Sequence, residues 1–330
     1  MYHILMRCDG RVKDPEKVFL SEMVNLGKGF MEVFVSFGDM ITGILGIKVD
    51  TKKSEISGYF SKIAETMKGV REKLGKILEE NGKYEKVKEK VEEFIGKISK
   101  IEEGAKEAAL GASGSELIGN AVKEGQAAVA ADTISVNLLV KGIKTIVDVV
   151  LKENEGDEKA DKTIDSDKKK VGQLFTNKND DRAQDTEAAK ASASVGAVSG
   201  ADILKAIAKS KEDSKADNTN GIEAAKDAAE IAIASAVDNK KEIKDPAKKD
   251  AVIAAGIALR AMAKDGKFAA KQDASDKYAN AVNGVVANAV SKVLSTLTIA
   301  IRNRVDEGLK EINKVLGEIK QGEISEAKSN

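Results

Sequence analysis

One apolar segment in the second half of the chain constrains the fold most strongly. Between residues 251 and 263, every residue except Arg260 is apolar or glycine. A helix that is apolar on nearly all sides is normally buried among other helices. The run is too short to span a membrane, which takes about 20 residues. The stretch 247–271 therefore predicts a buried central helix. A buried guanidinium needs a partner, so we expect Arg260 to pair with a carboxylate at the edge of the core.

The residues around this segment suggest where the helix begins and ends. Asp245 is a favourable capping residue, and Pro246 suits the first helical turn. Gly266 follows the apolar run and accepts the left-handed conformation common at helix ends. Phe268 is then expected to fold back over the end of the helix.

Further helices are predicted by apolar residues that recur every three or four positions. This spacing occurs in the stretches 19–37, 56–77, 84–101, 136–150 and 282–319. Because Asn81-Gly82 is a turn signal, the second and third stretches are expected to form an antiparallel pair. The sequence thus predicts an all-α, elongated multi-helix bundle. Its long N- and C-terminal helices would pack around the buried central helix.

Charged stretches separate the helices in the middle of the chain. We expect them to be mobile, solvated loops at the distal end of the bundle. They cover residues 152–170, 209–220 and 238–245. The predicted domain organisation is a tether stub at 1–14, a single helical domain at 15–322 and a disordered tail at 323–330.

Composition and charge exclude several functions. Lys and Arg total 54 and Asp and Glu total 54, so the chain has no net charge to attract nucleic acid. Aromatic residues make up only 4% of the chain, which also argues against base stacking. His3 is the only histidine, and this excludes the usual histidine-based catalytic and metal sites.

Two groups of acidic residues were considered as sites. Glu102, Glu103 and Glu107 can share a helix face, but Lys106 lies among them, which favours a solvated surface over a general-acid pair. The aspartates of 157–167 lack the spacing of a calcium-binding loop. We therefore predict no catalytic, cofactor-binding or metal-binding residues, no cofactor and no enzymatic activity.

Cys8 is the only cysteine, so no internal disulfide can form. A short apolar run precedes it, and Arg7 lies directly before the thiol instead of the small residue expected in a lipoprotein leader. From these residues alone, a structural or incidental cysteine and a lipid-attachment site both stay open.

Long stretches of the chain resemble the variable large proteins of Borrelia spirochaetes and their VlsE-like relatives. The central segment KKDAVIAAGIALRAMAKDGKFAAK is similar to the invariant-region peptide of that family. The likeness extends from about residue 14 to the last helix. It also includes DPEKVFLSEMVNLGKGF, SFGDMITGILGIKVDTKKSEI, LVKGIKTIVDVVLKE and ASASVGAVSGADILKAIAKS.

The resemblance implies a lipoprotein antigen of the outer membrane surface that acts in antigenic variation and immune evasion. Its partners would be host antibodies and, through an N-terminal lipid such as palmitate, the outer membrane. The protein would be a monomer or weak homodimer. Cys8 matches the lipidated position. We expect surface exposure if a complete leader is supplied, and otherwise a silent, unexported copy.

An adhesin is the alternative function. Such a binding module would capture a host serum protein, such as a complement component or plasminogen, through lysines near the C-terminus. The candidates are Lys310, Lys314, Lys320 and Lys328.

Overall fold

The computed structural model describes residues 24, 28, 46–81 and 85–329. His3, Cys8 and the tether stub at 1–14 lie outside the described residues, and so does the predicted helix at 19–37 apart from Val24 and Lys28. Within them, secondary structure is helical, and extended pairing is confined to isolated bridges such as Lys52 with Leu117.

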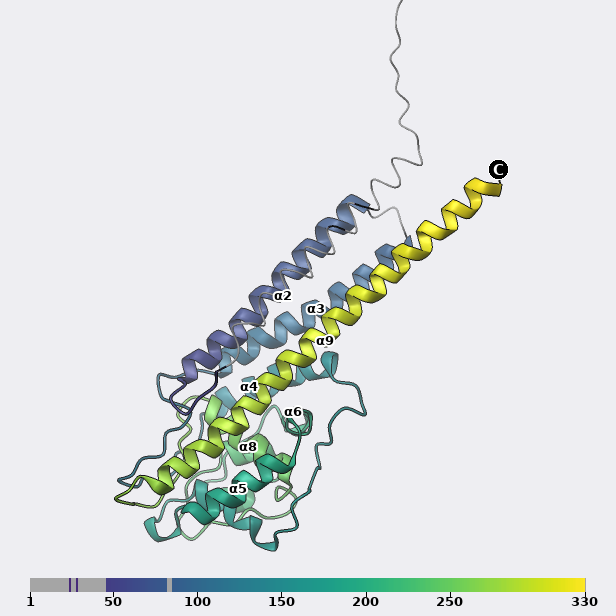
Figure 1. Ribbon diagram of the computed structural model, residues 1–330. Helices are drawn as coiled ribbons and strands as arrows, with labels where there is room; N and C mark the ends of the chain where they lie inside the picture. The colour runs from purple at the N-terminus through teal and green to yellow at the C-terminus, as the bar shows by residue number, and fades with distance from the viewer. Residues whose placement is uncertain (1–23, 25–27, 29–45, 82–84, 330) are drawn as a thin grey trace, which may run out of the picture.

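Three long helices run side by side and give the molecule its elongated shape (Figure 1). They are α2 (Lys53–Asn81), α3 (Glu85–Gly111) and α9 (Lys277–Ser329). The antiparallel pairing of α2 with α3 confirms the prediction made from residues 56–101. The C-terminus lies at the end of the long helices farthest from the other elements (Figure 1).

Apolar side chains at helical spacing hold the long helices together. Met67 and Leu74 of α2, Phe94 of α3, and Leu309 and Ile312 of α9 are all buried. Phe94 packs directly on α9 at Gly308, where an added β-carbon would lie 2.3 Å from the ring. The heptad-like spacing therefore produces a packed seam between the helices, as expected for coiled-coil-like contacts.

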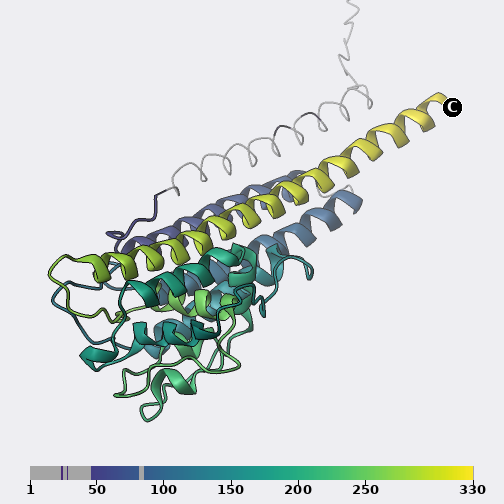
Figure 2. The same cartoon turned by 60° about the horizontal axis from the view of Figure 1, so that its bottom comes forward.

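The shorter elements form a dome at one end of the long helices (Figures 1 and 2). The α-helices are α4 (Thr133–Val150), α5 (Asp185–Ala197), α6 (Gly200–Lys209), α7 (Ala228–Ala232) and α8 (Asp250–Met262). The 3-10 helices are η1 (Ser166–Phe175), η2 (Asn179–Asp181) and η3 (Gly221–Ala224). One continuous cluster of buried apolar side chains joins the dome to the long helices.

Close backbone packing joins α4 to α3. A β-carbon on Gly142 would lie 2.4 Å from the carbonyl oxygen of Gly104, and one on Gly104 would lie 2.6 Å from the carbonyl oxygen of Gly142. About two turns further along α3, a β-carbon on Gly111 would lie 2.6 Å from the carbonyl oxygen of Ser135. Only glycine permits this approach, because any side chain would separate the two helices.

The last helix is longer than the sequence analysis expected. We expected a disordered tail at 323–330, whereas α9 continues to Ser329. Between Lys277 and Glu318 this helix is also long and apolar enough to cross a membrane, judged by length and composition alone. However, 56% of its most apolar 18-residue stretch is buried inside the protein, as in a helix of the protein core.

Candidate functional site

The centre of the dome is α8, and its burial confirms the predicted central helix. Every residue of α8 except Val252 is buried. The helix contacts α5, α6, α7 and α9. Its apolar surface is therefore covered on all sides, as its composition predicted.

The ends of α8 differ in detail from the expectation. The helix begins at Asp250 rather than at Asp245 and Pro246, so those two residues lie in the preceding loop. At the other end the positive φ belongs to Asp265, at 65°, and not to Gly266. Phe268 is buried and packs edge-on against Phe175.

The predicted carboxylate partner of Arg260 is wrong, because the guanidinium binds main-chain carbonyls instead. Its Nε donates to the carbonyl oxygen of Lys267 at 3.0 Å. Its Nη1 donates to three carbonyl oxygens around the C-terminus of α7, those of Ile231, Ala232 and Ala234, at 3.4, 3.0 and 3.0 Å. The guanidinium carbon lies 5.1 Å from the centre of the Phe175 ring. Burial lowers the pKa of Arg260 to about 9. The carbonyls at a helix end carry negative partial charge and can stabilise a cation without a carboxylate.

Lys53 is a second buried cation, and the sequence analysis did not identify it. Its Nζ donates to the carbonyl oxygens of Arg260, Ala263 and Gly266, at 3.4, 2.5 and 2.8 Å. The ammonium thus satisfies carbonyls that the C-terminus of α8 leaves free. It also ties the first residue of α2 to the central helix. Burial is the main influence on the titration of this side chain, and it lowers the pKa of Lys53 to about 7.

This lowered pKa predicts that stability rises with pH. The ordinary pKa of Lys53 is 10.5, so between about pH 7 and 10.5 the unfolded chain binds a proton that the folded protein does not. The free energy of unfolding should therefore increase across this window, by up to about 1.4 kcal/mol per pH unit. Urea unfolding from pH 6.5 to 9.5 measures the effect.

The Lys53→Met variant should lose this rise, whereas Lys52→Met, at the exposed neighbouring position, should keep it. Parallel curves for the protein and Lys53→Met would contradict the assignment.

A third cation repeats the same arrangement at another helix. Lys292 of α9 donates from Nζ to the carbonyl oxygens of Val195 and Val198, at 2.7 and 2.9 Å. These atoms lie at the C-terminal end of α5, which α9 contacts. Cations on distant elements thus stabilise the ends of three dome helices, α5, α7 and α8.

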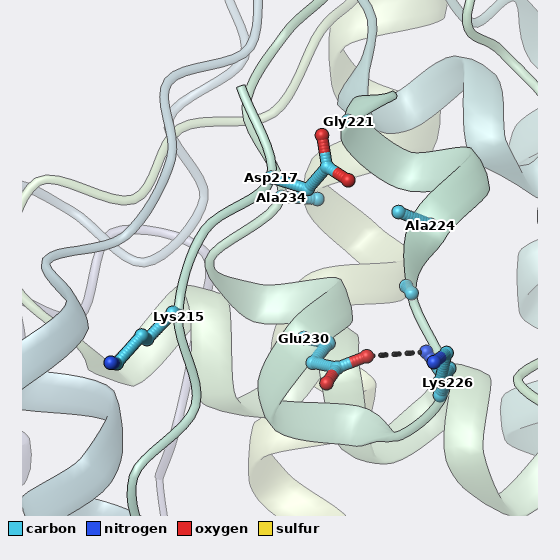
Figure 3. Close-up of a pocket in the computed structure, with 8 residues that line it drawn as sticks. Lys215, Asp217, Gly221, Ala224, Lys226, Glu230 and Ala234 are labelled. Carbon is cyan, nitrogen blue, oxygen red and sulfur yellow. Dashed lines mark hydrogen bonds between the residues drawn. The ribbon is translucent and has the colours of Figure 1, made fainter. Parts of the chain in front are cut away.

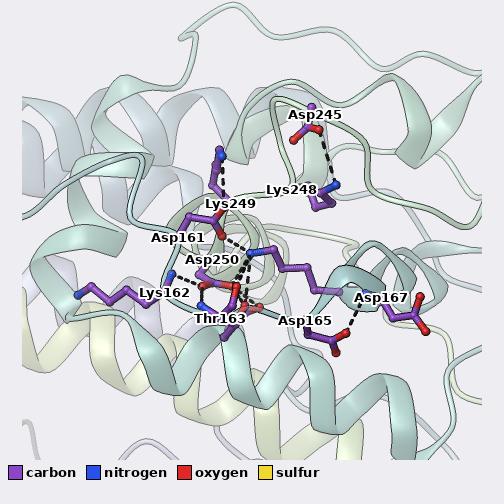
Figure 4. A network of polar contacts seen from close by, with 11 residues as sticks. Asp161, Lys162, Thr163, Asp165, Asp167, Asp245, Lys248, Lys249 and Asp250 are labelled. Atoms are coloured by element: carbon purple, nitrogen blue, oxygen red, sulfur yellow. Dashed lines mark hydrogen bonds and ion pairs between the residues drawn. The ribbon is translucent and has the colours of Figure 1, made fainter.

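A buried carboxylate holds the long charged loop against α8. Asp250 is completely buried, and four donors surround it in addition to the Lys168 ammonium, which lies 3.5 Å away (Figure 4). They are the backbone N–H of Lys162 and of Thr163, the Thr163 hydroxyl, each at 2.7 Å, and the Ser194 hydroxyl at 2.8 Å. Because two of the donors are main-chain amides, Asp250 fixes the path of the loop itself.

This anchor corrects the expectation that 152–170 is mobile and fully solvated. Lys168 is buried and contacts both Asp161 and Asp250. Burial alone would raise the pKa of Asp161, but hydrogen bonds from Lys168 and Lys249 hold it below its ordinary value. The high charge of the loop reflects paired groups as well as solvated ones.

A small pocket lies in the second charged region. It has a volume of about 240 Å³ and is lined by residues 215–234, including Asp217 and Glu230 (Figure 3). Main-chain amides already engage both carboxylates: Glu230 accepts from the N–H of Lys226, and Asp217 from those of Thr219 and Asn220. The Lys215 ammonium points away from these groups (Figure 3). The pocket therefore presents no free pair of groups suited to catalysis.

The acidic cluster considered in the sequence is part of the helix packing. Glu102 is buried and binds both Arg71 and Lys106, at 2.9 and 2.5 Å. Glu107 pairs with Lys141 of α4 instead. The structure thus divides the cluster between two sets of ion pairs. Among the described residues, no group of three potential ligands is arranged to hold a metal ion.

The candidate adhesin lysines lie on the outer part of α9. Lys310 and Lys314 are exposed, and they share a shallow surface with Asp306, Glu307 and Glu311. Interleaved acidic residues cancel most of the positive field that would attract a partner. Capture of a serum protein stays a prediction.

Comparison with known proteins places the chain among spirochaete surface proteins. A family model described as Borrelia lipoprotein matches residues 30–316. Variable large protein 17 of Borrelia hermsii is 56% identical over 303 residues, which cover 91% of this chain and 85% of the relative. Variable large protein 4 of the same species is 55% identical over 335 residues, which cover 100% of this chain and 94% of the relative.

A solved structure shares the fold. The crystal structure of the Lyme disease variable surface antigen VlsE of Borrelia burgdorferi matches with a TM-score of 0.79 and 33% sequence identity. The match covers 92% of this chain and 100% of that chain. The similarity therefore extends over both the long helices and the dome.

Proposed function

Because the chain belongs to the Borrelia lipoprotein family, among the variable large proteins, we propose that it is a lipid-anchored outer-surface antigen. It acts in antigenic variation and evasion of host antibody, without catalysis. Cys8 carries the lipid, and host antibodies are the partners of its exposed loops. The near-complete coverage of two variable large proteins is the observation that carries this proposal.

The architecture supports a division between frame and variable surface. The long helices and the buried α8 form a frame whose side chains are packed and intolerant of change. The charged segments at 152–170 and 209–220 consist mostly of exposed residues. Exposed loops bury little surface, so they tolerate substitution far better than the frame does. An antibody that reads these loops would miss a protein in which they have changed.

Lipid labelling and surface proteolysis test the anchor. The reading frame is expressed in a spirochaete behind its native upstream DNA, and cells are given radiolabelled palmitate. We expect the label in the protein, its loss in Cys8→Ala, and cleavage of the unsubstituted protein by protease added to intact cells. A triacylated cysteine anchors stably, whereas a protein without it would have only marginal affinity for the bilayer.

An unlabelled product that is protected from protease would contradict the proposal for this frame. Retention of the label in Cys8→Ala would instead show that a different residue carries the lipid. Cleavage of a cytoplasmic spirochaete protein in the same sample serves as the control for cell integrity.

A further inference from the structure

Lys168 has the most buried lysine side chain in the ion pairs that join described residues. It is 6% exposed, whereas the next, Lys190, is 18% exposed. Its Nζ contacts the carboxylate of Asp161 and lies 3.5 Å from that of Asp250. The carbonyl and hydroxyl oxygens of Thr163 are each 3.3 Å from the same nitrogen. These contacts hold the nitrogen at one point between the charged loop and α8.

The carboxyl group of Asp161 lies between two cations. Its Oδ1 contacts the Nζ of Lys168, and its Oδ2 accepts a hydrogen bond from the Nζ of Lys249 at 3.2 Å. The second carboxylate near Lys168, that of Asp250, is completely buried. Figure 4 shows Asp161, Lys249 and Asp250 close together at the start of α8. An amine, a carboxyl group in contact with it, a second carboxylate and a second cation therefore share one site.

These four groups are the parts that amide formation between two side chains requires. A lysine attacks as the neutral amine, so its ammonium must first give a proton to a neighbouring base, and both carboxylates are in place to accept protons. A cation on the far carboxyl oxygen stabilises the negative charge that develops there when the nitrogen adds. Holding the two reacting groups in contact removes the entropic cost of bringing them together.

We propose that Lys168 and Asp161 form an isopeptide bond, an amide between their side chains, with Asp250 as the base. The Lys168 ammonium gives one proton to Asp161, so the buried ion pair becomes an amine and a carboxylic acid. The Nζ then adds to the carboxyl carbon of Asp161. Asp250 accepts a proton from the nitrogen and returns it to the hydroxyl group, which leaves as water.

The atoms of this step balance without another reactant. One C–N bond forms, one C–O bond breaks and one water is released, so no oxidant or reductant takes part. Lys249 stays an ammonium throughout and stabilises the tetrahedral intermediate through the second carboxyl oxygen.

The bond closes a ring over residues 161–168 of the charged loop. Lys162 lies within this ring and its side chain is 55% exposed. Exposed loops are the preferred sites of proteolytic cleavage. Because the isopeptide bond bridges the position, a protease that cuts after Lys162 leaves the two halves of the chain joined. The ring thus protects the continuity of the loop in a way that hydrogen bonds cannot.

Intact mass spectrometry of the folded full chain, expressed without lipidation, tests the bond. We expect a mass about 18 Da below the value calculated from the sequence, because amide formation releases one water. Tryptic digestion should then yield residues 160–162 joined to residues 163–169, since a Lys168 that carries an amide is no longer cleaved.

The ion pair of Asp165 with Lys190 is an internal control for the digest. Its two side chains lie 2.8 Å apart, as close as an ordinary ion pair, but they are 40% and 18% exposed. We expect their peptides to be recovered separately, because water solvates the charges of this pair and keeps the lysine protonated.

Variants assign the part of each residue. Lys168→Met and Asp161→Ala should each have the full calculated mass, whereas Lys190→Met should still lose one water. Asp250→Asn keeps the size of the side chain but removes the base, so we expect it to lower the rate of linkage by at least about tenfold. Far-UV circular dichroism of Asp250→Asn checks that the variant is folded.

The mass of the unsubstituted chain decides the outcome even if a variant does not fold. A full calculated mass after prolonged incubation at neutral pH would overturn the proposal. A loss of one water that maps to a peptide without Lys168 would overturn it too, because an aspartate can also lose water to its own backbone. A folded Asp250→Asn that links as fast as the unsubstituted chain would overturn the part given to Asp250.

Discussion

Replacing Gly142 with alanine is expected to destabilise the protein by about 3 kcal/mol or more, the largest effect we predict for a single methyl group. The new β-carbon would lie 2.4 Å from the carbonyl oxygen of Gly104 and 2.5 Å from the amide nitrogen of Ala108. Both contacts are to backbone atoms of α3, which cannot rotate away as a side chain can. The alanine would therefore push α4 away from α3. Chemical unfolding followed by far-UV circular dichroism measures the loss.

The matched control is Gly75→Ala in α2, which should have the opposite sign. Nothing lies within 4 Å of a β-carbon at Gly75. Alanine is better than glycine in a helix interior by about 0.5–1 kcal/mol, so this variant should be slightly more stable. If Gly142→Ala were also neutral or stabilising, the close backbone approach of α3 and α4 would be refuted.

Replacing Asp250 with alanine is expected to cost about 3–5 kcal/mol, because it leaves several buried donors without their acceptor and removes one of the two carboxylates that the buried ammonium of Lys168 contacts. The amides of Lys162 and Thr163 and the hydroxyl of Ser194 would lose hydrogen bonds of 2.7–2.8 Å. Hydrogen exchange should show these two amides becoming unprotected, and chemical unfolding should report the lost stability.

Asp245→Ala is the control for this change. Asp245 is 70% exposed and pairs with Lys248 at 3.6 Å, so its removal should change stability by less than about 0.5 kcal/mol. Continued protection of the Lys162 and Thr163 amides in Asp250→Ala would mean that other contacts hold the loop.

Most of the helical frame could be predicted from the sequence, because side-chain periodicity reports directly on burial. The alternating steps of three and four residues over 56–77 and 84–101 correspond to α2 and α3, and the nearly continuous apolar run at 251–263 to the buried α8. These patterns repeat over many residues, so single exceptions do not obscure them. The prediction of where α8 ends was less accurate. The positive φ belongs to Asp265, although glycine is the residue that favours this conformation.

The polar contacts of the dome could not be predicted, because their partners leave no trace in the sequence. Arg260 looked like one half of an ion pair, yet all its acceptors are carbonyl oxygens. Lys53 lies in a lysine-rich stretch beside Lys52, and nothing in the sequence distinguishes the two. In the structure the side chain of Lys53 is buried and that of Lys52 is exposed. Asp250 gave a weak signal as the acidic residue directly before an apolar helix, but the charges around 152–170 suggested only solvation.

Four charged side chains, Arg260, Lys53, Lys292 and Asp250, share a property that bears on inheritance, because each binds main-chain groups. Arg260, Lys53 and Lys292 bind carbonyl oxygens, and Asp250 binds amide hydrogens as well as hydroxyl groups. A carbonyl oxygen is present whatever residue a gene specifies, and only proline removes an amide hydrogen. The side chains of the attached segments can therefore change between variants while the same main-chain contacts persist. The exposed surface can vary in this way without compensating substitutions in the protein interior.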